Sequence, residues 1–149
     1  MQQNIVKFLQ QKHIVILATF ADNDYWSAIC YYAFDEQQQR LLIRSNLDTR
    51  HAQLMLKNPH VTGSIIHDTQ TVAKLQGIQF NAEVTLLNGE EKKQALALYH
   101  SRFPYARVMK SPIWHILLNE VKFTDNTLGF GKKTLWQREK TADKNSSVF

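Results

Sequence analysis

Two apolar runs lie next to each other near the start of the chain, with only four residues between them. The first is His13 to Phe20 and the second is Tyr25 to Phe34, and the turn-forming segment 21–24 (ADND) separates them. β-Branched and aromatic residues dominate both runs, as is typical of strands. A connection this short joins antiparallel strands, because a parallel crossover needs a dozen residues or more. The sequence therefore predicts a β-hairpin here.

The rest of the chain repeats this pattern of short elements joined by short connections. Further strands are predicted at 40–44, 60–67, 72–87, 113–123 and 128–137, and helices at 4–12, 49–56 and from Asn88, where Glu91 completes an Asn version of the capping box. Gly77 inside a strand-like run predicts a bulge or a close backbone approach. About six strands with short turns predict an α+β, mainly β fold, an antiparallel barrel with short flanking helices. Strands apolar on both faces predict a homodimer that covers the barrel's outer face.

Length and composition predict one domain, residues 1–139, followed by a polar C-terminal tail, 140–149. The longest apolar run, Ile14 to Phe20, is too short to span a bilayer. The N-terminus lacks the layout of a signal peptide, and the single Cys30 cannot form an intrachain disulfide. We therefore expect a cytoplasmic protein without a membrane partner.

The chain is basic, with a formal net charge of +5. That charge suits an acidic partner or a phosphorylated ligand. The basic residues are spread from Lys7 to Lys144 and form no arginine-rich run or known nucleic-acid motif. Nucleic acid therefore ranks below a small anionic ligand as the expected partner.

One stretch, Leu41 to Pro59, combines a short strand, a polar turn and a short helix. The start of a helix exposes unpaired backbone N–H groups and carries a partial positive charge. The hydroxyls of Ser45 and Thr49 and the guanidinium of Arg50 lie at the same place, which suits a phosphate monoester. The alternative is an ordinary strand–turn–helix junction with Asp48 as the N-cap, whose charge would repel an anion.

Other reactive residues fall in no catalytic or metal-binding pattern. The six histidines show no zinc-ligand spacing, so no metal site is predicted. Cys30 lies in mid-strand, as a small core residue does. His51 is the one candidate general base near the turn, and its alternative is a solvent-facing helix residue or a phosphate neighbour. Catalytic residues stay unassigned.

The turn resembles the pyridoxamine 5′-phosphate oxidase-like, FMN-binding split-barrel family. The oxidase segment Tyr-Thr-Asn-Leu-Gly-Ser-Arg-Lys-Ala, running on to Asn-Pro, appears here without a gap as residues 44–52 (RSNLDTRHA) and 58–59. Near the end, residues 133–138 (KTLWQR) resemble the oxidase's Arg-Phe-Leu-Tyr-Gln-Arg. The resemblance is closer still to an uncharacterised bacterial branch, which carries the sequences found here at 49–53 (TRHAQ) and 123–133 (FTDNTLGFGKK).

This resemblance implies a split barrel that holds FMN at a homodimer interface. Carried over by position, Ser45 and Thr49 would bond the FMN phosphate, Arg50 would pair with it, and His51 would lie beside it. Lys133 falls where the family places an arginine near the flavin. The backbone of residues 27–32 would lie along the isoalloxazine.

The chain also departs from the family. Ser27, Tyr32 and His51 replace basic residues, and residues 129–131 (GFG) replace the Arg-x-His that grips pyridoxal phosphate. True pyridoxamine phosphate oxidation is therefore not expected. The sequence predicts an FMN-binding protein, an oxidoreductase on another small substrate. The alternatives are a flavin- or ligand-binding module without turnover, such as a sensor or stress protein, and, third, a basic nucleic-acid-associated protein. The substrate and the electron donor stay open.

Overall fold

The computed structural model of this protein describes residues 1–140, so the expected tail lies outside the described residues apart from Lys140. Thirteen elements follow one another along the chain. They are α1 (Gln3–Gln11), β1 (Ile14–Ala21), β2 (Asp24–Asp35), β3 (Arg40–Arg44), α2 (Arg50–Lys57), β4 (His60–Ile66), η1 (Val72–Lys74), β5 (Gln76–Leu86), α3 (Gly89–Arg102), η2 (Pro104–Val108), β6 (Ile113–Asp125), η3 (Asn126–Leu128) and β7 (Lys133–Gln137).

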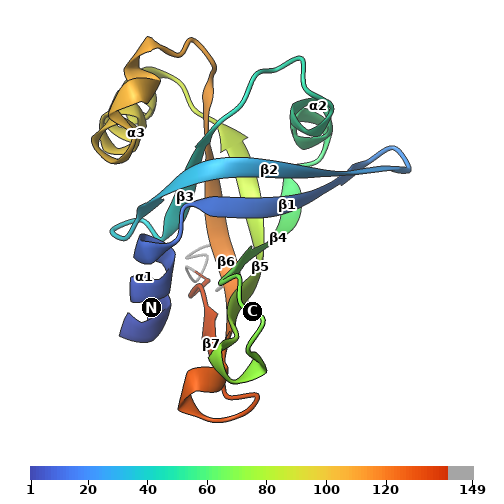
Figure 1. The fold of residues 1–149 in the computed structure, drawn as a ribbon. Coiled ribbons are helices and arrows are strands. Elements are labelled where there is room, and N and C mark those ends of the chain that lie inside the picture. The colour runs from blue at the N-terminus through green and yellow to red at the C-terminus, as the bar shows by residue number, and fades with distance from the viewer. Residues whose placement is uncertain (141–149) are drawn as a thin grey trace, which may run out of the picture.

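The strands form one antiparallel sheet in the order β3-β2-β1-β4-β5-β6-β7. A further pairing of β3 with β6 closes the first six strands into a barrel and leaves β7 as an extra strand beyond it (Figure 1). The predicted fold, an antiparallel barrel with short helices, is confirmed. The hairpin is also confirmed, with Val15 opposite Cys30 and Ala21 opposite Asp24.

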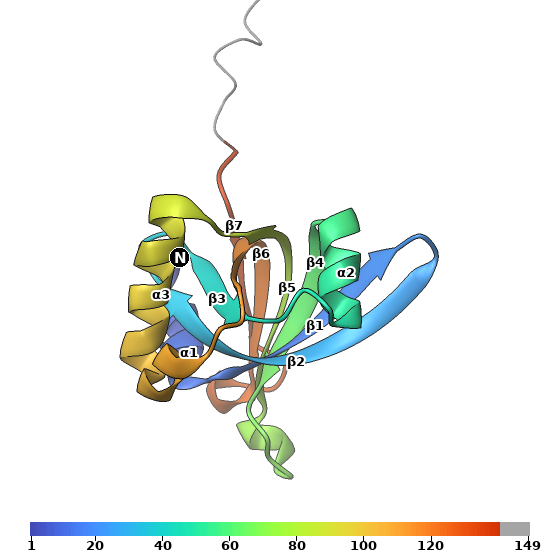
Figure 2. The same ribbon diagram turned by 90° about the horizontal axis from the view of Figure 1, so that it is seen from above.

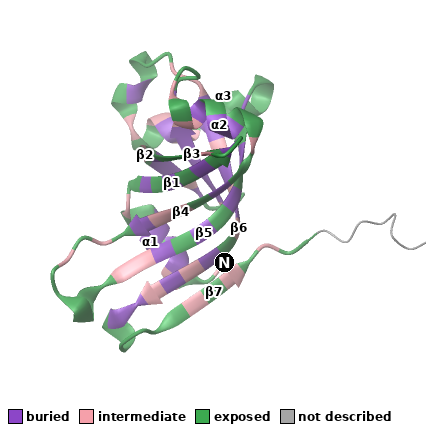
Figure 3. Ribbon diagram, turned by 90° about the vertical axis from the view of Figure 1, so that its right-hand side faces the viewer, coloured by how far each residue is buried: buried purple, intermediate pink, exposed green. Residues whose placement is uncertain are grey.

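The barrel interior is the main core, and α1 covers part of it. Each strand alternates between the two faces, as in β1, where Val15 and Leu17 are buried and their neighbours are exposed. Figure 3 shows buried and exposed residues alternating along strands such as β1 and β5. Helix α1 adds Ile5, Phe8 and Leu9 to the core, because its apolar residues recur at helical spacing.

A second apolar cluster forms where α3 packs on the outside of the barrel. Ala95 and Tyr99 of α3 are buried there against Leu42 of β3 and Ile113 of β6. Seen from above, α3 and α2 flank the barrel on opposite sides, and the segment that joins β3 to α2 runs between them (Figure 2).

Several local predictions are wrong. The run 128–137 is a strand only from Lys133 onwards, because Asn126–Leu128 forms a 3₁₀ turn. The run 72–87 is not one strand, because Val72–Lys74 forms a 3₁₀ turn before β5. The irregularity in β5 lies at Asn81/Ala82 and not at Gly77, and a Cβ on Gly77 would meet only ordinary contacts, 3.6 Å from the Ile65 oxygen at the nearest. Asn88 precedes α3 as its N-cap residue, but its side chain makes no capping hydrogen bond.

Candidate functional site

The site expected from the sequence forms where β3 ends and α2 begins. Thr49 is the N-cap of α2, and its Oγ1 accepts a hydrogen bond of 3.2 Å from the Ala52 N–H. The helix therefore begins one residue later than a cap at Asp48 would require, so the prediction of Asp48 as the N-cap residue is wrong. The threonine hydroxyl also donates to the Asn46 carbonyl at 2.9 Å. We call Ser45, Thr49 and His51, with the first N–H groups of α2, the cradle.

Ser45 is held rigidly at the base of the cradle. Its N–H donates to the Pro112 carbonyl at 3.1 Å, and its carbonyl accepts from the indole N–H of Trp114 at 3.0 Å. Its Oγ lies 2.5 Å from Nε2 of His51, and the same nitrogen lies 3.3 Å from Oγ1 of Thr49. Burial lowers the pKa of His51. Ser45 and Thr49, which the sequence predicts to lie together at this turn, are thus brought together with His51, whose imidazole is largely neutral at pH 7.

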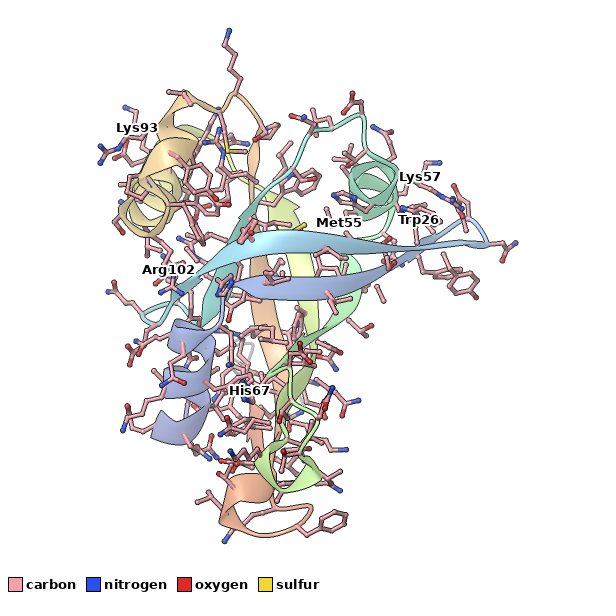
Figure 4. The ribbon with its side chains drawn as sticks, viewed as in Figure 1. Trp26, Met55, Lys57, His67, Lys93 and Arg102 are labelled. Atoms are coloured by element: carbon pink, nitrogen blue, oxygen red, sulfur yellow. The ribbon has the colours of Figure 1, made fainter. Side chains whose placement is uncertain are left out.

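Arg50 lies next to these residues but turns towards the β1–β2 hairpin. Its Nε donates to Oδ2 of Asp24 at 3.2 Å, its Nη2 pairs with Oδ1 of the same carboxylate, and its guanidinium stacks 4.1 Å from the centre of the Trp26 ring. The bond to Arg50 lowers the pKa of Asp24, and Asp24 raises that of Arg50. Figure 4 shows Trp26 beside α2 at the hairpin end of the molecule. The expected phosphate-pairing cation is therefore already paired.

Sequence reasoning did not find Asp24 and Trp26, because no local pattern links them to a residue so much later in the chain. It also did not find the role of Arg44. That guanidinium donates to the carbonyls of Ala106, Met109 and Ser111 at 2.6 to 3.1 Å. Arg44 thus ties the segment after α3 to the start of the turn, and it is not free to bind a ligand.

Strand β2 has an open edge beside the start of α2. It pairs with β1 from Asp24 to Tyr31, but with β3 only from Tyr32 onwards. Tyr32 N–H bonds to the His13 carbonyl, and bonded and non-bonded pairs alternate along an antiparallel ladder. It follows that Ser27 and Ile29 direct their backbone N–H and C=O groups to the open edge, where no described strand pairs with them.

The structure shows where two residues that depart from the family pattern, Tyr32 and Ser27, direct their side chains. Tyr32 is buried inside the barrel, where its hydroxyl donates to the Leu9 carbonyl at 2.8 Å and anchors α1. It is a core residue and cannot replace a cation at the site. The side chain of Ser27 faces the other way and lines a groove of about 500 Å³ on the outer face of the sheet, with Thr62 and Gln79.

Lys133 does not join the other predicted residues within one chain. Ile113, at one end of β6, pairs with Arg44 next to the cradle, and Thr124, near the other end, pairs with Lys133. At ~3.3 Å per residue, roughly 35 Å of strand separates the two pairs.

The outer face of the β1–β2 hairpin carries large apolar side chains that stay exposed in the described chain. They are Ile14, Ile16 and Phe20 of β1, and Tyr25, Ile29 and Tyr31 of β2. The groove lined by Ser27 lies on this same face. Contiguous apolar surface of this kind marks interaction sites in soluble proteins.

Neither a metal-binding cluster nor a membrane-spanning helix occurs among the described residues. Within residues 1–140, no group of three or more His, Cys, Asp or Glu side chains is placed to hold a metal ion. None of the helices in that range is long and apolar enough to cross a membrane.

Comparison with known proteins places the chain in a family. The pyridoxamine 5′-phosphate oxidase family matches residues 1–125. A UPF0306 protein of Serratia proteamaculans is 45% identical over 137 residues, covering 92% of this chain and 95% of that one.

Solved structures share the fold at low sequence identity. A heme-binding protein from Mycobacterium smegmatis superposes with a TM-score of 0.74 at 12% identity, over 92% of this chain and 59% of that one, so this chain spans about three fifths of its length. A FAD-binding protein from Mesorhizobium loti has a TM-score of 0.67 at 16% identity, over 83% and 94% of the two chains. With the barrel and the turn that carries Ser45 and Thr49 both in place, the chain belongs to the pyridoxamine 5′-phosphate oxidase family.

Proposed function

We propose that this protein binds FMN, with the phosphate at the cradle and the isoalloxazine along the open edge of β2. The observation that carries the proposal is the proximity of these two features. Arg50, the first residue of α2, contacts Asp24 and Trp26 of β2, so the start of the helix lies against the strand whose backbone groups are unpaired. A phosphate takes hydroxyl and N–H donors, and the ring's polar edge takes backbone donors and acceptors.

The described residues offer donors for the phosphate and backbone groups for the ring of such a ligand. Ser45 and the first N–H groups of α2 supply donors for the phosphate, while Thr49 sets the direction of the helix. The backbone of Ser27 and Ile29 orients the ring. When bound, FMN supplies hydride-transfer chemistry, which makes oxidoreduction of a small substrate the reaction class we propose.

We further propose that the protein acts as a homodimer through the outer face of the β1–β2 hairpin. The exposed apolar side chains of that face, Ile16 and Ile29 among them, support a second copy as the partner. Because β6 separates Lys133 from the cradle within one chain, Lys133 reaches a flavin in this proposal only from the other subunit.

The test compares FMN with riboflavin, which lacks the phosphate. Quenching of flavin fluorescence should show tighter binding of FMN than of riboflavin. Ser45→Ala should weaken FMN binding by about tenfold, the loss of one hydrogen bond to a charged group, and leave riboflavin binding unchanged. Equal affinity for the two flavins would exclude the cradle as the phosphate site, and no binding of either would exclude the flavin proposal.

Turnover is tested separately from binding. Reduction of the bound flavin by NADH or NADPH, followed in the visible spectrum, would support an oxidoreductase. Flavin uptake without reduction would instead indicate a binding module. Hemin is titrated in parallel, because the Mycobacterium smegmatis relative is named for heme binding, and preference for hemin over FMN would contradict the proposal.

A further inference from the structure

Among the described residues, the two arginines next to the cradle in the chain are both engaged in other contacts. Arg50 is held by the Asp24 carboxylate and the Trp26 ring, and Arg44 is bonded to backbone carbonyls of the segment after α3. Lys57, at the far end of α2, pairs with Asp22 at 3.3 Å. His51 is therefore the group at the cradle whose charge can change near neutral pH.

What the contact between Ser45 and His51 offers to an anion depends on whether Nε2 of His51 carries a proton. A neutral ring with its proton on Nε2 frees the Ser45 hydroxyl hydrogen but adds no positive charge, and only the protonated ring supplies both. With His51 neutral and Nε2 unprotonated, the Ser45 hydroxyl donates its hydrogen to that nitrogen across 2.5 Å. The hydrogen is then not available to a ligand. With His51 protonated, Nε2–H donates instead, and the Ser45 oxygen accepts. The hydroxyl hydrogen is released to point at an anion, and the imidazolium adds a positive charge.

We propose that the cradle binds a phosphate or sulfate group together with a proton, which His51 takes up from solvent. One proton is bound as the anion binds, the hydrogen bond between Ser45 and His51 reverses, and no other covalent bond forms or breaks. The inference rests on the proposed function, because it concerns the same cradle. In this proposal the positive charge that faces the anion comes from protonated His51 and not from Arg50. The affinity for the anion therefore rises as pH falls.

The surroundings of His51 support this assignment. Next to it in the chain, the charged groups are Arg44, Asp48 and Arg50. Of the strands in contact with α2, β2 adds Asp24 and Asp35, and β5 adds Glu83. Asp35 pairs with Arg40, and Glu83 lies 3.9 Å from His60. Arg44 is bonded to carbonyls, and Arg50 and Asp24 neutralise each other. Burial alone lowers the pKa of His51, so the neutral form prevails without a ligand. An anion that contacts the imidazolium reverses this preference by direct attraction.

The experiment uses inorganic sulfate, because a phosphate monoester itself titrates near pH 6 whereas sulfate stays a dianion. Sulfate affinity is measured by NMR between about pH 5.5 and 8.5 at constant ionic strength. It should rise by up to about tenfold per pH unit as pH falls towards the pKa of His51, the limit for uptake of one proton. Sulfate should also raise the pKa of the His51 ring, since the coupling is reciprocal.

Two variants separate charge from structure. His51→Gln should bind sulfate weakly at every pH, and His51→Lys should bind it with little pH dependence, because lysine keeps its charge throughout the range. Wild-type affinity that does not change with pH would overturn the inference. FMN binding that is unaffected by His51→Gln at low pH would overturn it as well, while leaving the proposed FMN function intact. Failure of both sulfate and FMN to bind at any pH would overturn both.

Discussion

At the scale of the residue, Gly63 marks the tightest packing position among the strand glycines. A Cβ at Gly63 would overlap Cζ of the Phe80 ring and lie 2.7 Å from the Ile16 carbonyl oxygen. Gly63→Ala should lower the free energy of unfolding by about 1–3 kcal/mol, measured by urea denaturation, because the backbone of β1 cannot give way cheaply. Gly77→Ala is the control and should be neutral or slightly stabilising. Equal losses in the two variants would contradict the packing argument.

Tyr32 shows how a residue at a family site position becomes part of the core. Tyr32→Phe should lower the free energy of unfolding by about 1 kcal/mol, since the Leu9 carbonyl loses its hydroxyl donor. Burial raises the pKa of Tyr32 above its unfolded value, so this contribution is complete below about pH 10 and is lost at higher pH. The wild type should therefore lose stability more steeply than the variant above pH 10. Tyr31→Phe, at the half-exposed neighbour, serves as the control.

At the scale of the element, α2 depends on its N-cap and on its ties to the hairpin. Thr49→Ala should cost about 1 kcal/mol of unfolding free energy, because the Ala52 N–H loses its acceptor. Thr49→Ser keeps the hydroxyl and should retain most of the stability. Denaturant titrations of the two variants check this, and an equal cost in both would show that the methyl group, and not the cap, matters.

At the scale of the whole molecule, the outer face of the hairpin should control assembly. Ile29 is 76% exposed at the centre of that face. Ile29→Lys places a charge where a second copy would pack, so light scattering should show a change from two chains to the 17.4 kDa monomer. Leu56→Lys, at an exposed apolar residue of α2, should leave the dimer intact. A monomeric wild type would contradict the proposed homodimer.

Much of the fold could be predicted because it depends on local patterns. The turn at 21–24 determines the hairpin, and the polar turn before α2 brings Ser45 and Thr49 together within a few residues. The predictions at Gly77 and Asn88 failed for a different reason. Whether a glycine is tightly packed, or a side chain caps its helix, depends on neighbours that are distant in the sequence.

The sequence alone was sufficient for the antiparallel barrel, for the family and for the proximity of Ser45 and Thr49 at the turn, because strand periodicity, turn residues and helix starts are short-range properties. The tertiary structure decided which of the other predicted or family-site residues can reach a ligand at the cradle. Only the fold brings Asp24 and Trp26 to Arg50, buries Tyr32 under α1, and separates Lys133 from the cradle by the length of β6. Each of these arrangements depends on segments that are far apart in the sequence. The pairing of the strands determines whether such segments lie side by side or far apart. That pairing leaves His51, bonded to Ser45, as the titratable charge at the cradle.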